Sequence, residues 1–302
     1  MTFRKSKLAF VLADCVAALA GTAIVASYLP FSLLLHASTP TGGDNPAHPV
    51  LIRSIEEALR HGSIVHYSYL FWSGFEAFRF YFPVPYLLGA LLNALLPLGQ
   101  AYTWVTVLPA LLLPPSFYFL ARGAGLARLS ALLSSLLAVS FFHTKAHTIW
   151  GGNIFSTMAG MFANAWGFVF LSLAIGSVVY LRRVDDPSRL SVIGAVILHL
   201  LTIGSHFYSF LLLIWMHGVL LTVDLIQNFF SGTTSRRWRR SLFCVGTSVL
   251  LMGWWLIPLI GYRSYAADFG GDWEISLLRT LSIPELWFFG GVGIAALLIL
   301  MW

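Results

Sequence analysis

Long apolar runs separated by short polar turns dominate the chain, and the lengths of these runs predict membrane-spanning helices. Inside a bilayer only a helix or a closed barrel can satisfy every backbone hydrogen bond. Because a crossing takes about 20 apolar residues, the pattern predicts an all-α polytopic transmembrane helical bundle of about eight spans. The apolar runs cover approximately residues 8–35, 100–121, 129–142, 157–181, 190–205, 207–229, 241–261 and 285–302.

One further apolar stretch, FPVPYLLGALLNALLPLG at 82–99, does not fit a crossing helix. It contains Pro83, Pro85 and Pro97, which leave 11 uninterrupted residues between the inner two prolines. Because a full crossing needs about 20 residues, we expect a re-entrant or interfacial helix here.

The polar stretch 36–81 contains an amphipathic pattern at 48–62, which predicts a second helix outside the bilayer core. Such a helix is expected to lie flat on the membrane with its apolar face down. With 82–99 it would form an amphipathic and re-entrant helix pair within one outer-face loop, 36–99. Its apolar face carries Leu51, Ile55, Ala58 and Leu59, and its charged face carries the i,i+4 pairs Arg53–Glu57 and Glu56–Arg60.

Composition agrees with a membrane protein. Charged residues make up 10% of the chain, and the mean hydropathy is +0.80, whereas about a quarter of the residues are charged in soluble domains. Cys15 and Cys244 both lie within apolar runs, which favours neither a disulfide nor a metal site. We treat 1–302 as a single transmembrane domain, and we expect the protein to continue because the chain stops inside an apolar run.

Basic residues predict the orientation in the membrane. The first apolar run is too long for a signal-peptide core and follows three cations, so we expect a retained helix with a cytoplasmic N-terminus. The later basic clusters all fall inside if 82–99 does not cross. We therefore expect a multi-pass protein of a prokaryotic cytoplasmic (inner) membrane. The later clusters are Arg122/Arg128, Arg182/Arg183/Arg189 and SRRWRR at 235–240.

The motif TGGDNPAHPV at 41–50 places an acid and a histidine just beyond the first apolar run. Asp44 has two interpretations. It could cap the following helix, or it could act as a general base that takes a proton from a substrate hydroxyl. His48 could bind a metal or a phosphate, or it could be a surface histidine at the start of a helix.

The order of features in the first loop resembles that of the GT-C glycosyltransferases, which use polyprenyl-phosphate-linked sugars. These features are GGDNPAH, an amphipathic helix, and the stretch W-x-x-G-x-x-x-F-R-F-Y-F-P-x-P-Y. The pattern also resembles the membrane family named 6-pyruvoyl-tetrahydropterin synthase-related. The resemblance covers residues 8–260 in layout and is motif-like over 42–89, more faintly at 150–153. It implies that Asp44 is a catalytic base or a metal ligand.

Other polar residues of the outer loops are candidates for binding a sugar or a phosphate. Glu76 and Arg79 flank an aromatic stretch, and the guanidinium of Arg263 suits a phosphate. In the loop FFHTKAHTIWGGN the candidates are Lys145, His147, Trp150 and Asn153, although an ordinary basic and aromatic interface loop would look the same. No acid lies between Glu76 and Asp185, so the second acidic motif of many GT-C enzymes is missing, and a divalent metal cofactor remains an open question.

Three functions fit these features. The first is a GT-C-like glycosyltransferase that moves a sugar from a polyprenyl-phosphate donor to an acceptor on the outer face. The second is a non-catalytic membrane subunit or scaffold of a larger complex, and the third is a lipid or solute transporter. The expected partners are membrane lipids, the lipid-linked donor and other membrane subunits. SRRWRR is better explained by anionic lipid than by nucleic acid. Asp14 and Asp224 are expected to reach the nearby cytoplasmic surface.

Overall fold

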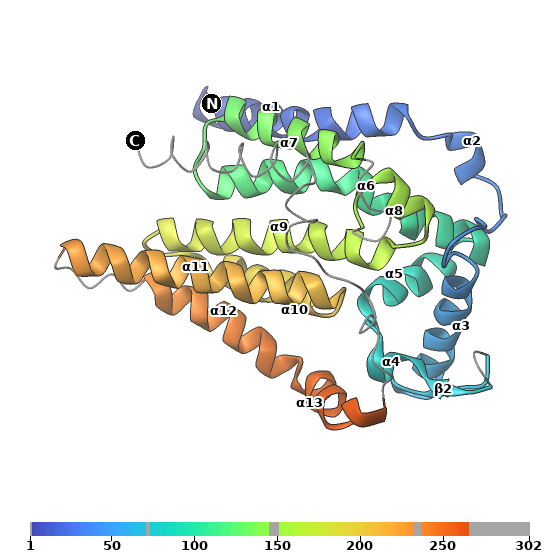
Figure 1. Cartoon of the computed structure of the whole chain (residues 1–302). Coiled ribbons are helices and arrows are strands. Elements are labelled where there is room, and N and C mark those ends of the chain that lie inside the picture. Colours follow the sequence, from blue (N-terminus) through green and yellow to red (C-terminus); the bar gives the residue numbers. More distant parts are fainter. Residues whose placement is uncertain (1, 71–72, 145–150, 232–236, 266–302) are drawn as a thin grey trace, which may run out of the picture.

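The computed structural model describes residues 2–70, 73–144, 151–231 and 237–265. Its long helices lie side by side in one bundle, and α12 crosses the others at a slant (Figure 1). The long helices are α1 (Thr2–Ser27), α6 (Leu98–Gly123), α7 (Arg128–Phe142), α9 (Phe162–Arg183), α10 (Arg189–Ile203), α11 (Phe207–Ser231) and α12 (Arg237–Leu251).

Shorter elements gather mainly at one end of this bundle (Figure 1). They are α2 (Phe31–Leu34), α3 (Ala47–Arg60), β1 (Tyr67–Ser68), β2 (Phe75–Glu76), α4 (Ala77–Phe80), α5 (Val84–Asn93), α8 (Ile154–Met158), α13 (Gly253–Gly261) and the 3-10 turn η1 (Arg263–Tyr265).

The described part of the chain is an all-α membrane protein apart from one two-stranded hairpin. By length and composition α6, α9 and α11 can each cross a membrane, and α12 with α13 forms a possible fourth span bent by 64°. The apolar parts of α1, α7 and α10 are shorter helices. Helix length therefore does not confirm eight spans, and the expected span at 285–302 lies outside the described residues.

The C-terminal ends of α6, α9 and α11 lie at one end of the bundle, which we call the basic end (Figure 1). The opposite end, which we call the loop end, carries α3, α4, α5 and the hairpin. α5 has 10 residues, about 15 Å of helix, which is roughly half the apolar thickness of a bilayer. α5 is therefore too short to cross, and the chain turns from α5 into α6 at the loop end, as the prolines predict.

Two expected helices are interrupted. The apolar run 8–35 is not a single helix, because α1 ends at Ser27 and α2 starts only after Pro30. Proline has no N–H to donate and its ring disfavours a continuous helix. The run 157–181 is divided in the same way: α8 ends at Met158, and Gly160, with φ of +90°, turns the chain before α9.

The apolar face of the amphipathic helix was expected to meet the membrane, but in the structure it meets protein. The apolar face of α3 packs against α5 and α6, and Ile52 and Ile55 are fully buried in the main core cluster with Phe78. Leu59, expected on the apolar face, is 46% exposed. The expected i,i+4 ion pairs are also replaced, since Glu56 pairs with Arg53 at 3.3 Å.

Both aspartates within the apolar runs are paired with arginines; Asp224 is buried and does not reach the surface as expected, whereas the side chain of Asp14 is partly exposed. Asp224 is 1% exposed, and its Oδ1 lies 2.6 Å from a guanidinium nitrogen of Arg182. Asp14 lies 3.1 Å from Arg128 and 3.4 Å from Arg122. Each pair joins different helices, so these charges hold the basic end together.

Candidate functional site

The loop that carries Asp44 is fixed through its backbone. The Asp44 N–H donates to the carbonyl oxygen of Ala159 at 2.9 Å, and the Asp44 carbonyl accepts from Ala47 at 3.0 Å. Gly43 has a φ of +54°, and a Cβ there would collide with the Ala159 carbonyl. Glycine is therefore required where the first loop meets the segment after α8.

Asn45 binds the same two loops together through its side chain. Its amide nitrogen donates to the carbonyl of Gly42 at 2.7 Å and to that of Met158 at 2.8 Å. Its amide oxygen accepts from the hydroxyl of Tyr102 on α6 at 2.7 Å. Asn45 is 1% exposed, and its buried amide group is satisfied by these three hydrogen bonds. Asn45 therefore fixes the loop, and the carboxylate of the neighbouring Asp44 is not needed for that purpose.

The carboxylate of Asp44 is exposed and forms no hydrogen bond or ion pair with any residue that the structure describes. The residue before α3 is Pro46, and no side chain caps the helix there. The capping interpretation of Asp44 is therefore wrong for this structure. What remains is an exposed carboxylate on a loop whose backbone is held by hydrogen bonds.

His48 lies directly behind this loop and is buried, with 4% exposure. Its Nδ1 is 2.7 Å from the hydroxyl of Tyr86, and the rings of Phe162 and Tyr102 lie 5.0 and 6.0 Å away. Its Nε2 has no hydrogen-bond partner among the described residues. The surface interpretation of His48 is therefore wrong, because the imidazole belongs to an aromatic shell under Asp44.

Burial determines the charge of this shell. It lowers the pKa of His48 to about 4, although the Asp44 carboxylate and the Gly160 carbonyl act in the opposite direction. Burial also raises the pKa of Tyr86 well above its usual value, and Asp44 adds to that effect. At neutral pH His48 and Tyr86 are consequently uncharged.

An apolar cavity of about 280 Å³ opens beside Asn45, between the turn that follows α1 and the helices α6, α7 and α8. Its walls are mostly hydrocarbon, which suits a lipid chain or another apolar group. The residues that line it include Tyr28, Pro40, Asn45, Thr103, Phe142 and Met158.

Glu76 and Arg79, both expected to face a substrate, form an ion pair at 2.7 Å. The hydrogen bond that the Arg79 guanidinium donates to Glu76 raises the pKa of Arg79, and the guanidinium lies 5.1 Å from the ring centroid of Tyr262. Because Arg263 follows Tyr262 and is exposed in η1, the chain brings these two expected arginines to neighbouring positions.

Asn153 plays a structural part in the second loop. It is fully buried, and its side-chain oxygen caps α8 by accepting from the Ser156 N–H at 2.7 Å. This leaves Asn153 supporting α8, the helix whose end contacts the Asp44 loop. The other candidates of that loop, Lys145, His147 and Trp150, lie outside the described residues.

Sequence reasoning did not identify Asn45, Tyr86 or Tyr102 as members of this site. Asn45 stands inside the quoted motif, so its position was the available signal. The two tyrosines gave none, since one lies in α5 and the other in α6, and only the folded chain brings them to His48.

Comparison with known proteins gives a family. Residues 78–281 match the family described as 6-pyruvoyl-tetrahydropterin synthase related domain, membrane protein. This is about two thirds of the 302 residues, so the chain belongs to that family. The resemblance to this family is confirmed, whereas the resemblance to GT-C glycosyltransferases stays a prediction. No curated protein and no solved structure matches the chain. Asp44 and His48 precede the matched segment, whereas Tyr86 and Tyr102 lie within it.

Proposed function

We propose that this protein is a GT-C-like glycosyltransferase that acts at the loop end. In this proposal it moves a sugar from a polyprenyl-phosphate-linked donor to the hydroxyl of an acceptor. The observation that carries the proposal is the Asp44 carboxylate, which is held by backbone hydrogen bonds, exposed, and without a partner in the described part of the chain.

The chemistry assigned to Asp44 is that of a general base. Its carboxylate takes the proton of the acceptor hydroxyl while the hydroxyl oxygen bonds to the anomeric carbon of the sugar. The bond from that carbon to the phosphate oxygen breaks, and the polyprenyl phosphate leaves with the electron pair. A carboxylate without an internal partner is available for this proton transfer, whereas a paired one is not.

Two features of the structure support a lipid-linked donor. The apolar cavity next to Asn45 offers hydrocarbon walls for part of a polyprenyl chain. Arg263, exposed in η1, adds positive charge at the loop end, and guanidinium groups bind phosphate through two parallel hydrogen bonds. Neutral His48 contributes no charge of its own, so it supports Asp44 by position and packing.

The test uses the full chain in lipid nanodiscs with a radiolabelled polyprenyl-phosphate hexose. Transfer is measured as loss of label from the lipid fraction. Asp44→Asn removes the proton acceptor but keeps the size of the side chain, and we expect it to slow transfer about 10²–10⁴-fold. Asp186→Asn is the matched control, because Asp186 is an exposed aspartate in the turn between α9 and α10.

Two outcomes contradict the proposal. One is a wild-type rate for Asp44→Asn, which would remove Asp44 from the reaction. The other is that the wild-type protein consumes no label from donors carrying glucose, galactose or mannose. The second outcome would favour a non-catalytic subunit of a membrane complex.

A further inference from the structure

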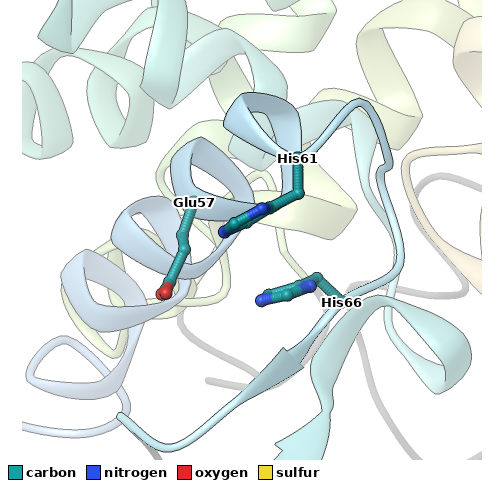
Figure 2. A group of neighbouring side chains, drawn as sticks. All are labelled: Glu57, His61 and His66. Carbon is teal, nitrogen blue, oxygen red and sulfur yellow. The ribbon is translucent and has the colours of Figure 1, made fainter.

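A second group of polar side chains lies at the far end of α3 from Asp44. It consists of Glu57 and His61, at the end of the helix, and His66, just before β1. One ligand atom from each residue lies within 4.8 Å of the others. Figure 2 shows the two imidazole rings with a nitrogen edge of each turned toward the Glu57 carboxylate.

The local sequence explains why these three side chains meet. Glu57 and His61 are four residues apart, so they lie on one face of the helix. Gly62, with φ of +72°, then reverses the chain, and the Ser63 N–H bonds back to the Ala58 carbonyl at 3.0 Å. This reversal returns the chain along α3 and places His66 beside His61, with the two ring centroids 4.8 Å apart.

The return segment is anchored on both sides of His66. Ile64 and Val65 pack against the main core cluster. Two residues after His66, the Ser68 hydroxyl lies 2.9 Å from that of Ser54 on α3, and both serines are buried. The position of His66 is therefore determined by the fold, as the position of a metal ligand has to be.

None of the three side chains is occupied by an ion pair or hydrogen bond in the described residues. Arg53, one helical turn before Glu57, pairs with Glu56 at 3.3 Å. His61 and His66 contact each other only as stacked rings, with 17° between their planes. Three potential ligands thus face one another without competing partners.

We propose that Glu57, His61 and His66 bind one Zn²⁺ ion, with water as the fourth ligand. Two imidazole nitrogens and one carboxylate form a common ligand set for zinc with an open fourth position. Ligand atoms around tetrahedral zinc are about 3.4 Å apart, given bonds of about 2.0–2.1 Å. The side chains close by rotation about their terminal torsions, which are soft in glutamate and histidine.

This site is separate from the proposed transferase site. Glu57 follows the first residue of α3 by 10 positions, about 15 Å along the helix axis. The ion would not reach the Asp44 carboxylate, and its binding does not depend on the proposed function. It would join the end of α3 to the segment that leads into the hairpin, at a place where His61 is exposed and open to solvent.

The test measures Zn²⁺ binding by calorimetry on the full chain, purified in detergent and stripped of metal with a chelator. We expect one ion per chain in the wild type. Co²⁺ in its place should give the visible absorption of a tetrahedral site. Glu57→Gln and His66→Ala each remove one ligand. Each should weaken Zn²⁺ binding by at least about 10–100-fold. That is the loss observed when residues that hydrogen-bond to metal ligands are changed, and loss of a ligand itself should cost no less.

His36→Ala is the matched control, because His36 is an exposed histidine of the same loop that lies outside the group. It should bind Zn²⁺ as the wild type does. The proposal is overturned if the wild type binds no stoichiometric Zn²⁺, or if Glu57→Gln binds it with wild-type affinity. Glutamine keeps the helix intact, so Glu57→Gln tests whether these residues bind Zn²⁺ even if His66→Ala does not fold.

Discussion

At the basic end Asp224 is buried against Arg182 at 2.6 Å, whereas at the loop end Asp44 is exposed and contacts no cation in the described residues. Both are aspartates of a membrane protein with few charged groups. The difference lies in what holds each one: Asp224 is held by its own carboxylate, and Asp44 by its backbone and by Asn45. A charge held by its carboxylate serves stability, and a charge held by its backbone remains available for chemistry.

The surroundings of the two aspartates differ in the same sense. The second carboxylate oxygen of Asp224 is buried without a hydrogen bond in the described residues, so the pair with Arg182 is the main compensation for its burial. Asp44 stands over His48 and Tyr86, which are neutral and hydrogen-bonded to each other. Exposure lets water solvate the Asp44 side chain. Removing its charge should therefore change the free energy of unfolding little, and we expect a larger effect on the proposed transfer reaction.

The largest effect is expected at the basic end. Arg182→Ala leaves Asp224 as a buried and unpaired charge, which should lower the free energy of unfolding by about 3–5 kcal/mol. Chemical denaturation of the purified protein in detergent measures the change. Arg189→Ala, an exposed arginine at the start of α10, is the control and should be nearly silent. A loss below about 1 kcal/mol for Arg182→Ala would mean that the pair does not stabilise the bundle.

An intermediate effect is expected from pH at the loop end. The pKa of His48 falls from 6.5 to about 4 on folding, so the unfolded chain takes up the proton first. Stability is complete above the unfolded value and decreases as the pH falls from about 6.5 to about 4, by about 3 kcal/mol in all.

Denaturation of wild type and His48→Gln at pH 7 and at pH 4.5 measures this contribution. The variant should lose part of the pH dependence but keep the part due to His206, whose pKa burial also lowers to about 4. An identical pH dependence in the two proteins would show that His48 is not buried as a neutral group.

The smallest expected effect on the free energy of unfolding gives the most direct test of the difference between Asp44 and Asp224. Asp44→Asn should change the free energy of unfolding by no more than about 0.5 kcal/mol, as expected for an exposed side chain without partners. Measured under the same denaturing conditions, Asp224→Asn should be several times more destabilising. Equal losses for the two variants would refute the distinction between a structural and an available aspartate.

The sequence predicted the helices well because their cause is local. An apolar run in a bilayer has to satisfy its own backbone, so α6, α9 and α11 could be placed within a few residues. Pro30 and Gly160 are residue types that often interrupt helices, so the two breaks could have been predicted from the sequence. The amphipathic pattern of α3 identified its apolar face, but periodicity cannot tell whether that face meets lipid or protein.

The candidate site was less predictable because its contacts are distant in sequence. The motif drew attention to Asp44 and His48, yet the residues that explain their behaviour, Tyr86 and Tyr102, come from separate helices. For the same reason, the sequence could have indicated only two of the three residues of the proposed zinc site. Glu57 and His61 share a helical face by spacing alone, whereas His66 joins them only through the turn at Gly62.

The hydrogen bond from Asn45 to Met158 also constrains how the protein is made, because it joins residues 113 positions apart. Ribosomes add about 5–20 residues per second, so the partner of Asn45 is synthesised about 6–23 s after Asn45 itself. α6 and α7 are synthesised within that interval, while the Asp44 loop still lacks the segment that fixes it. The loop therefore reaches its final form only when the chain up to α8 has emerged, about half-way along the 302 residues.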